Sequence, residues 1–216
     1  MLKKSFTDSD QALELGLSIR ARRKELGLTM LAVADAAGLS VGFISQVERG
    51  LSAPSLASLA GITEILKMPR GSFLSQPDAG DMTRSSRREV YSVPGAAASY
   101  ERVSSTFSGS KLHSIIVHEP PGHRSEPISH KGEEMFFILE GEITVEIEGD
   151  KEILRQGDTI HFDSTRIHST WNHGLTTASL LWCGTMDVFG DAPSPIHKIS
   201  SLSGESNTNP KGEKNK

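Results

Sequence analysis

The residues best suited to recognition chemistry lie in the stretch Val41–Arg49. If this stretch is helical, Ile44 points inward, and Ser45, Gln46 and Arg49 lie on the exposed side. An amide side chain can make two hydrogen bonds to adenine, and a guanidinium group pairs well with phosphate. These side chains are typical of a surface that contacts bases and phosphates.

Two short helices that meet at a sharp corner would hold this face in place. Thr29 is suited to cap the first helix, because its hydroxyl can accept a hydrogen bond from a free backbone N–H. Small Ala34 lets the two helices approach closely, and Gly38 supplies the positive φ that the corner requires. Ser40 then caps the second helix, whose buried side includes Val47.

Over Leu15–Leu66 the sequence resembles a helix-turn-helix of the phage-repressor-like (XRE) family. The small, corner and buried residues stand at the family spacing, and Gln46–Gly50 followed by Pro54–Leu56 resembles its signature. The resemblance implies that the protein binds double-stranded DNA. The implied DNA-binding residues are Thr29, Ser40, Val41, Gly42, Ser45, Gln46 and Arg49. Most of those on the second helix match base-reading positions, and Arg49 lies near the family's phosphate contacts.

The chain departs from the family pattern at Met30, where relatives often have a Gln that helps to bind phosphate. Val41 and Gly42 offer little hydrogen bonding, so specificity is expected to rest on few base contacts and on DNA shape. Arg23 and Glu48 match a pair that forms an internal salt bridge in related repressors. We therefore expect these two residues to be structural.

A helical domain is expected over residues 12–75, after a loose arm at residues 1–11 and before a linker at residues 76–86. The first helix is predicted at Ala12–Leu26, and the fourth at Ser55–Leu66, with apolar residues at helical spacing. A short helical turn at Arg70–Leu74 would complete a five-helix domain.

Length and composition fit one large or two small globular domains: 216 residues, 36% hydrophobic, with 20 Gly and 10 Pro. The formal net charge of −4 is unevenly distributed. Residues 1–79 carry nine basic and eight acidic side chains, whereas residues 80–199 carry eleven and seventeen. Because phosphate repels an acidic surface, DNA contacts are assigned to the N-terminal part.

Cys183 is the only cysteine, so an internal disulfide is excluded and a reducing compartment is consistent with the sequence. The first residues lack the apolar core of a signal peptide, and no apolar run approaches the roughly 20 residues of a membrane helix. These features predict a cytoplasmic protein that has no membrane partner.

Beyond the linker the hydrophobic period changes to two, which predicts strands within residues 87–199. The expected strands are Glu89–Val93, Glu101–Phe107, Leu112–His118, Glu134–Leu139, Ile143–Glu148, Lys151–Leu154, Thr159–Phe162, His168–Asn172 and Ala178–Thr185. Many short strands with turns between them are typical of a sandwich or barrel. The end of the chain, residues 200–216, has almost nothing to bury and is expected to be disordered.

Two motifs in this region resemble those of the cupin barrel, a double-stranded β-helix. The first is His130–Glu134, followed by six residues and Gly141. The second runs from Gly157 to Asn172, with Asp163 and Thr165 where the family usually has Pro and Gly. Together the motifs imply an all-β barrel with a pocket at its mouth.

Metal-binding cupins use three His and one Glu as ligands. By resemblance, His130 is the second His, Glu134 the carboxylate and His168 the last His. The first position is Ile128, which cannot bind a metal. Two His and one carboxylate form the set that leaves open positions on non-heme Fe(II). The sequence is therefore compatible with a divalent metal ion bound in the pocket.

The competing interpretation is a metal-free pocket that holds an organic effector. The expected pocket residues are His130, Glu134, Phe136 and His168. Regulators with this two-domain layout are thought to use the barrel as a sensor, and many lack a complete ligand set. We weigh metal-free or facultative binding above a dedicated metal site.

The sequence thus predicts a two-domain α + β protein, with an all-α five-helix DNA-binding domain followed by an all-β cupin barrel. We expect a transcriptional regulator, not an enzyme, that binds its operator as a homodimer and senses a small-molecule effector. One alternative is a metal-dependent cupin enzyme, because a phosphonate epoxidase that carries a helix-turn-helix uses two His and one Glu. The other is an antitoxin-like or adaptor protein whose helices contact protein.

Overall fold

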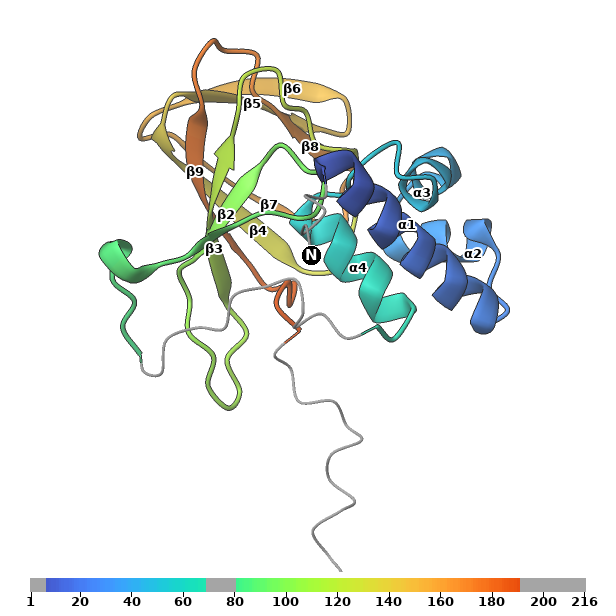
Figure 1. The fold of residues 1–216 in the computed structure, drawn as a ribbon. Helices are drawn as coiled ribbons and strands as arrows, with labels where there is room; N and C mark the ends of the chain where they lie inside the picture. The colour runs from blue at the N-terminus through green and yellow to red at the C-terminus, as the bar shows by residue number, and fades with distance from the viewer. Residues whose placement is uncertain (1–6, 69–80, 191–216) are drawn as a thin grey trace, which may run out of the picture.

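The computed structural model describes residues 7–68 and 81–190, which form a helical part followed by strands (Figure 1). The described helices are α1 (Asp8–Glu25), α2 (Met30–Ala37), α3 (Val41–Glu48) and α4 (Leu56–Ile65). The predicted α + β fold class, with the helical domain first, is confirmed. The predicted fifth helix at Arg70–Leu74 lies outside the described residues, as do the start of the predicted linker and residues 200–216.

The first helix begins at Asp8, earlier than the predicted start at Ala12. Asp10 N–H donates to the Thr7 hydroxyl at 3.2 Å, and Thr7 N–H donates to the Asp10 carboxylate at 3.1 Å. This reciprocal pair satisfies backbone N–H groups that a helix start leaves free. Residues 8–11 are therefore helical and not part of a loose arm. The prediction was wrong because it followed the apolar residues and overlooked the polar cap.

The sharp corner between α2 and α3 forms as predicted. Gly38 has φ +64°, and the hydroxyls of Thr29 and Ser40 accept the capping hydrogen bonds, both at 3.0 Å. The two helices are bent by 113°, within the range of about 90–120° for a helix-turn-helix. Among the described residues no single helix has the length and apolar character to cross a membrane, although this bent pair passes that test by length and composition.

A buried ion pair joins α1 to the end of α3. Arg23 donates to Glu48 through both Nε and Nη2, the latter at 2.8 Å, and its Nη1 donates to the Leu28 carbonyl at 2.9 Å. The Arg23 and Glu48 side chains are only 11% and 5% exposed. Their predicted structural role is confirmed. Since removal of one partner would leave a buried charge without compensation, the pair holds these two helices together.

All nine predicted strands are present, with ends shifted by a few residues. They are β1 (Val90–Tyr91), β2 (Ser99–Arg102), β3 (His113–Glu119), β4 (Glu133–Glu140), β5 (Glu142–Ile147), β6 (Asp150–Arg155), β7 (Thr159–Asp163), β8 (His168–Trp171) and β9 (Ala178–Gly184). A short 3-10 turn, Ser85–Arg87, precedes them. The largest shift is at β2, which ends at Arg102 and not at the predicted Phe107.

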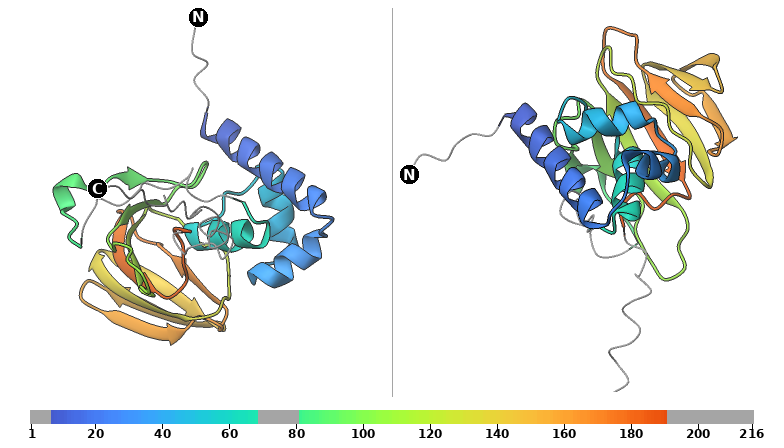
Figure 2. Two further views of the ribbon diagram at one scale, coloured as in Figure 1. Left: turned by 90° about the horizontal axis from the view of Figure 1, so that it is seen from below. Right: turned by 90° about the vertical axis from the view of Figure 1, so that its right-hand side faces the viewer.

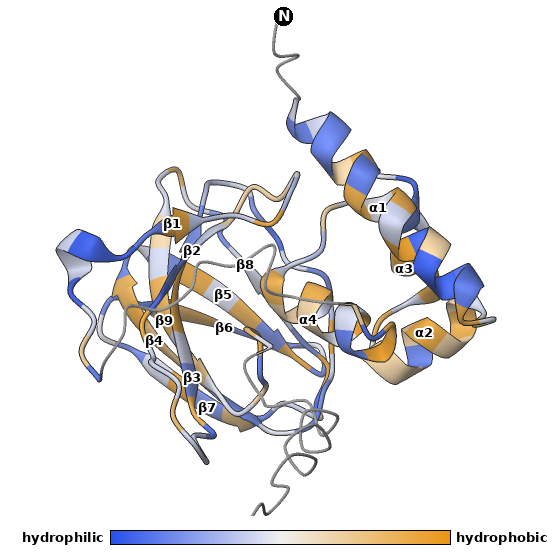
Figure 3. Cartoon of the chain, turned by 60° about the horizontal axis from the view of Figure 1, so that its bottom comes forward, coloured by the Kyte–Doolittle hydropathy of each residue, from blue (hydrophilic) through white to orange (hydrophobic). Residues whose placement is uncertain are grey.

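The strands form two antiparallel sheets, ordered β1-β2-β3-β9-β4-β7 and β6-β5-β8. The sheets curve around one interior (Figure 2). Hydrophobic segments along β3, β4 and β9 contribute to that interior, and others on α2 and α4 pack in the helical part (Figure 3). Ile138, Ile143 and Leu180 are among the fully buried side chains. This is the all-β barrel that the second half of the sequence predicts.

The helical part packs against the barrel, with α4 nearest to it (Figures 1 and 2). Ser55 donates to the Glu126 carboxylate from its backbone N–H at 2.9 Å and from its hydroxyl at 2.8 Å. Leu56 N–H donates to the phenol oxygen of Tyr100 at 3.2 Å. The barrel therefore caps the first turn of α4, and Glu126 places negative charge at the positive end of the helix dipole.

The corner of the helix-turn-helix makes a second contact with the barrel. The Gly38 carbonyl accepts from Ser129 N–H at 3.2 Å, and a Cβ added to Gly38 would lie 1.8 Å from the Ser129 carbonyl oxygen. Glycine is thus required here both by the positive φ and by the close approach of the barrel. Ser129 immediately precedes His130, so this contact adjoins the predicted pocket.

Candidate functional site

The predicted DNA-contacting face of α3 is open to solvent, and its opposite face is packed. Ile44 and Val47 on the packed side are 0% and 1% exposed. The predicted residues on the open side are Val41, Gly42, Gln46 and Arg49, all exposed, and Ser45, which is half-buried. Thr29 and Ser40 are exposed at the starts of α2 and α3, where free N–H groups and the helix dipole favour phosphate.

Neighbouring groups hold two of the polar side chains on this face. Ser52 O–H donates to Gln46 Oε1 at 2.8 Å, which leaves the amide N–H groups of Gln46 free to donate to a base. Arg49 Nε donates to the Ser45 carbonyl at 3.1 Å. Sequence reasoning missed Ser52, because no spacing rule links the loop after α3 to the exposed face of that helix.

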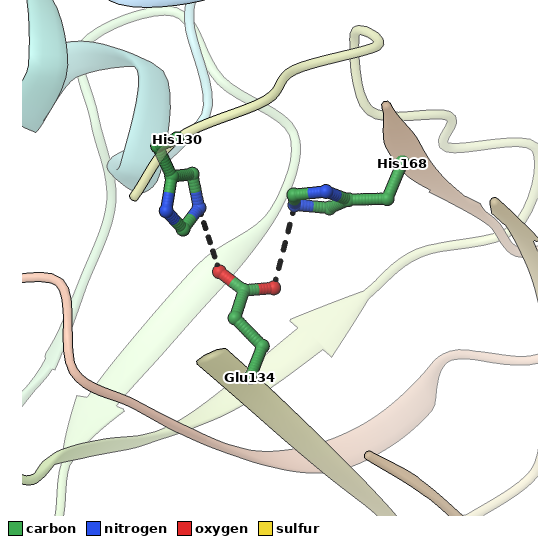
Figure 4. Close-up of side chains that lie close together, drawn as sticks. All are labelled: His130, Glu134 and His168. Atoms are coloured by element: carbon green, nitrogen blue, oxygen red, sulfur yellow. Dashed lines mark ion pairs between the residues drawn. The ribbon is translucent and has the colours of Figure 1, made fainter. Parts of the chain in front are cut away.

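The barrel brings the three predicted metal-ligating residues together (Figure 4). Glu134 lies on β4, His168 begins β8, and His130 lies in the loop before β4. His130 Nε2 is 2.9 Å from Glu134 Oε1, and His168 Nε2 is 3.4 Å from Glu134 Oε2. Their side chains are 10%, 6% and 2% exposed for His130, His168 and Glu134. The carboxylate therefore stands between two imidazoles in a nearly dry site.

Backbone carbonyls set the orientation of both imidazoles. His168 Nδ1 lies 2.8 Å from the Arg166 carbonyl, and His130 Nδ1 lies 3.3 Å from the Lys131 carbonyl. Since a carbonyl oxygen only accepts, each Nδ1 carries a proton and each Nε2 faces Glu134. Burial opposes the charged form of His130, but the Glu134 carboxylate outweighs it and raises the pKa of His130. At His168 burial prevails over Glu134 and lowers the pKa.

This donor set fits a divalent metal ion. One ligand atom from each of the three residues can be chosen so that all lie within 4.8 Å of one another. His130 Nε2 is buried, and in the neutral imidazole its lone pair would be available to a metal. Ile128, at the first ligand position of the family pattern, is buried and pairs with His168 through two backbone hydrogen bonds of 3.0 and 2.9 Å. It contributes a hydrocarbon side chain and no ligand.

A cavity at the barrel mouth extends from this triad to the start of α4. The space that water-sized molecules can occupy is about 90 Å³, enough for several waters or a small organic molecule. Glu134, His168 and the predicted pocket residue Phe136 line it. The helical part contributes the first residues of α4 to its wall, namely Ser55, Leu56 and Ala57. His130 borders Glu134 but is not part of the cavity wall.

Several polar residues of this cavity escaped sequence reasoning, among them Glu119, His123 and Glu126. Burial lowers the pKa of His123, although Glu126 opposes the shift, and burial raises the pKa of Glu119 to about 7 against a hydrogen bond from Thr170. Glu119 could have been found, because it continues the inward alternation of Ile115 and Val117 on β3. The predicted strand ended one residue too early, at His118.

Two family descriptions match the chain, each over one of its parts. The helix-turn-helix family matches residues 19–72, and the cupin domain family matches residues 115–184. A solved structure of similar fold is an HTH_3 family transcriptional regulator from Vibrio cholerae. It is 21% identical with a TM-score of 0.50, and the match covers 83% of this chain and 98% of that one.

Three curated relatives of the chain are named as transcriptional regulators. HTH-type transcriptional regulator PuuR of Escherichia coli (strain K12) is 26% identical over 184 residues, 84% of this chain and 100% of the relative. HTH-type transcriptional regulator SutR of the same organism is 22% identical, covering 76% and 89%. Transcriptional regulator ClgR of Mycobacterium tuberculosis is 32% identical over 84 residues, 39% of this chain and 73% of the relative.

These matches agree with the geometry in both parts of the molecule. The α2–α3 corner with its exposed face accounts for the helix-turn-helix match, and the two-sheet barrel with its triad accounts for the cupin match. The chain belongs to the DNA-binding helix-turn-helix transcriptional regulators of the XRE type that carry a C-terminal cupin domain.

Proposed function

We propose that this regulator senses a small molecule in the cavity at the barrel mouth and that the occupied cavity changes its affinity for operator DNA. The observation that carries the proposal is the shared wall of the cavity. Leu56 at the start of α4 lines the same space as Glu134 and His168 on the barrel. A molecule in that space touches a helix of the DNA-binding domain directly. Such contacts are how a ligand favours one conformation over another.

Operator recognition is assigned to the exposed face of α3. Gln46 reads adenine through its amide, Val41 contacts a thymine methyl group, and Ser45 adds a further hydrogen bond. Gly42 permits close approach of the base edges. Arg49 and the starts of α2 and α3, marked by Thr29 and Ser40, contact phosphates and fix the register of the helix in the major groove. The solvent exposure of this face supports the assignment.

The regulator acts as a homodimer in this proposal. Two recognition helices must lie about 34 Å apart to enter successive major grooves on one side of the duplex. Two of the contacts between helices and barrel, Ser55–Glu126 and Gly38–Ser129, adjoin the pocket. A change of angle at these contacts alters the separation of the two recognition helices. Because allosteric couplings are typically about 1–3 kcal/mol, a small rearrangement suffices.

The triad of His130, Glu134 and His168 favours a second candidate function, a metal-dependent cupin enzyme. A bound divalent ion would supply open coordination positions to a small polar substrate. In that case the exposed residues of α3 would be dispensable for activity. We rank this function second, since the regulator layout uses both parts of the chain.

The metal question has a direct test. Purified protein and a Glu134→Ala variant are compared by elemental analysis. We expect less than one transition metal ion per chain in both preparations. Near-stoichiometric iron that disappears in the variant, together with turnover that depends on Fe(II), would establish the enzyme function instead.

Selection of genomic DNA fragments by the purified protein tests the proposed function as a whole. We expect enrichment of a site with two related halves about one helical turn apart, and an affinity that falls steeply with salt as phosphate contacts release counterions. Retention of no fragment at low salt would contradict operator binding and would favour a role in protein contacts.

A further inference from the structure

Glu119 carries a buried carboxylate in which only one of the two oxygens accepts a hydrogen bond from the described residues. Its side chain lines the cavity, and the residue is 3% exposed. Oε1 accepts from the Thr170 hydroxyl at 2.6 Å, whereas Oε2 is fully buried and has no hydrogen-bond partner among the described residues. A buried carboxylate oxygen without a partner is costly, so its persistence calls for a donor that residues 7–68 and 81–190 do not provide.

The rest of the cavity wall narrows the chemistry of that partner. The acidic side chains on the wall are Glu119, Glu126 and Glu134, and no Lys or Arg of the described part of the chain lines it. Burial lowers the pKa of His123, which keeps its imidazole neutral near pH 7. An anionic ligand would meet only like charge here, whereas a cation would meet complementary charge.

All three carboxylates have a partner within the protein, but only Glu119 has a fully buried oxygen that lacks one among the described residues. Glu126 accepts two hydrogen bonds from Ser55, and Glu134 lies between His130 and His168. Glu119 is therefore the carboxylate that can receive a donor from outside the chain. Its pocket is otherwise apolar, with Trp182, Phe136 and Leu180 on the wall. Hydrocarbon next to one carboxylate suits a ligand with an apolar body and one ammonium group.

We propose that the cavity binds a small organic ammonium ion, whose N–H groups donate to Glu119 and whose hydrocarbon body packs against the aromatic wall. This inference rests on the proposed sensing function and names the chemical class of the effector. The ammonium ion gives Glu119 Oε2 its missing partner. The same ligand touches Leu56 across the cavity, so that binding at Glu119 reaches α4.

Calorimetric titration of the full-length protein with n-butylammonium and benzylammonium chloride tests the inference. Sodium butyrate and 1-butanol serve as probes of equal chain length without the cation. We expect saturable binding of one ammonium ion per chain and no measurable binding of butyrate. Glu119→Gln should weaken n-butylammonium binding at least about thirtyfold, because the variant removes one partner of a buried charge pair.

A matched control is Glu152→Gln, which makes the same chemical change at an exposed position of β6 and should leave binding unchanged. Glu119→Asp retains the charge, so it should keep the preference for n-butylammonium over butyrate if Glu119→Gln fails to fold. Equal binding of butyrate or 1-butanol, loss of the preference in folded Glu119→Asp, or undiminished binding by Glu119→Gln would overturn the inference. A protein that retains operator DNA but binds neither ammonium ion would refute the ammonium ligand alone, whereas loss of DNA retention would refute the proposed function.

Discussion

Gln46 carries most of the hydrogen-bonding capacity on the recognition face of α3. Val41 and Gly42 bring no polar side-chain atom, and Ser45 is half-buried. Ser52 already donates to the amide oxygen of Gln46, which orients the amide before DNA arrives. Preorganisation of this kind reduces the side-chain entropy lost on binding. Sequence discrimination is therefore expected to depend on few side chains.

Replacement of Ser45 and Gln46 by Ala should reduce the ratio of operator to random-DNA affinity by about ten- to hundredfold, since a bidentate base contact discriminates by about 1–3 kcal/mol. Random-DNA affinity itself should stay nearly constant. Arg49→Ala provides the contrast, because loss of a phosphate contact should weaken both kinds of DNA alike. Fluorescence anisotropy with labelled duplexes measures both affinities. An unchanged ratio in the double variant would remove Gln46 from base recognition.

The burial of the Glu119 carboxyl group predicts an unusual dependence of the free energy of unfolding on pH. Burial raises its pKa from 4.5 to about 7, so between these values the native chain holds a proton that the unfolded chain has lost. The contribution of Glu119 to stability is thus largest below pH 4.5 and declines as pH rises through 7. Glu119→Gln should be about 3 kcal/mol more stable than the parent at pH 8. The two proteins should converge near pH 4.5, and urea unfolding at both pH values measures the difference. Equal stability at pH 8 would contradict the raised pKa.

At the scale of helices and strands, the features that follow from the local spacing of apolar residues were predicted correctly. Ile44 and Val47 defined the buried side of α3, and period-two alternation located every strand of the barrel. The caps Thr29 and Ser40 were predicted, but the cap at Thr7 was not, so α1 begins at Asp8 and not at the predicted Ala12. The docking of α4 on the barrel could not be predicted, because Glu126 meets Ser55 across 71 residues of sequence and no local pattern links them. The cavity wall lies on both parts, so only its barrel side was predicted.

The corner between α2 and α3 offers a test of how much its contact with the barrel contributes to stability. Gly38→Ala should suffer two penalties, the positive φ and the clash with Ser129. Gly27→Ala is the matched control, since Gly27 has φ +67° and nothing within 4 Å of an added Cβ. We expect Gly27→Ala to cost about 1–2 kcal/mol and Gly38→Ala clearly more, measured by urea unfolding. Equal losses would mean that the contact with the barrel adds nothing to stability.

At the scale of the whole molecule, the proposed DNA-binding surface and the proposed sensing cavity are linked through a short stretch of chain. The exposed face of α3 and the cavity wall of α4 are separated by the loop around Ser52 and Pro54. Leu56 donates its N–H to Tyr100 and Ser55 is held by Glu126, so the barrel fixes one end of that stretch. The other end carries Gln46. Movement of α4 away from the barrel therefore displaces the support of the recognition helix.

A variant that loosens this attachment should separate sensing from DNA binding. Tyr100→Phe combined with Glu126→Ala removes the acceptors for Leu56 N–H and for Ser55 while leaving Glu119 and the face of α3 intact. Operator affinity without ligand should stay within a few-fold of the parent. The change in affinity on saturation with n-butylammonium should fall from about 5–150-fold towards none.

Glu148→Ala is a suitable control for this variant, because it removes an ion pair with Arg166 whose two side chains are exposed on the barrel. Anisotropy titrations with and without n-butylammonium measure the coupling, and calorimetry confirms that the variant still binds the ion. The first turn of α4 is the only part of the described helices that lines the cavity, so we expect a signal from ligand to DNA to depend on how this turn is attached to the barrel. Full ligand response in a double variant that still binds n-butylammonium would show that the signal travels by the Gly38–Ser129 contact instead.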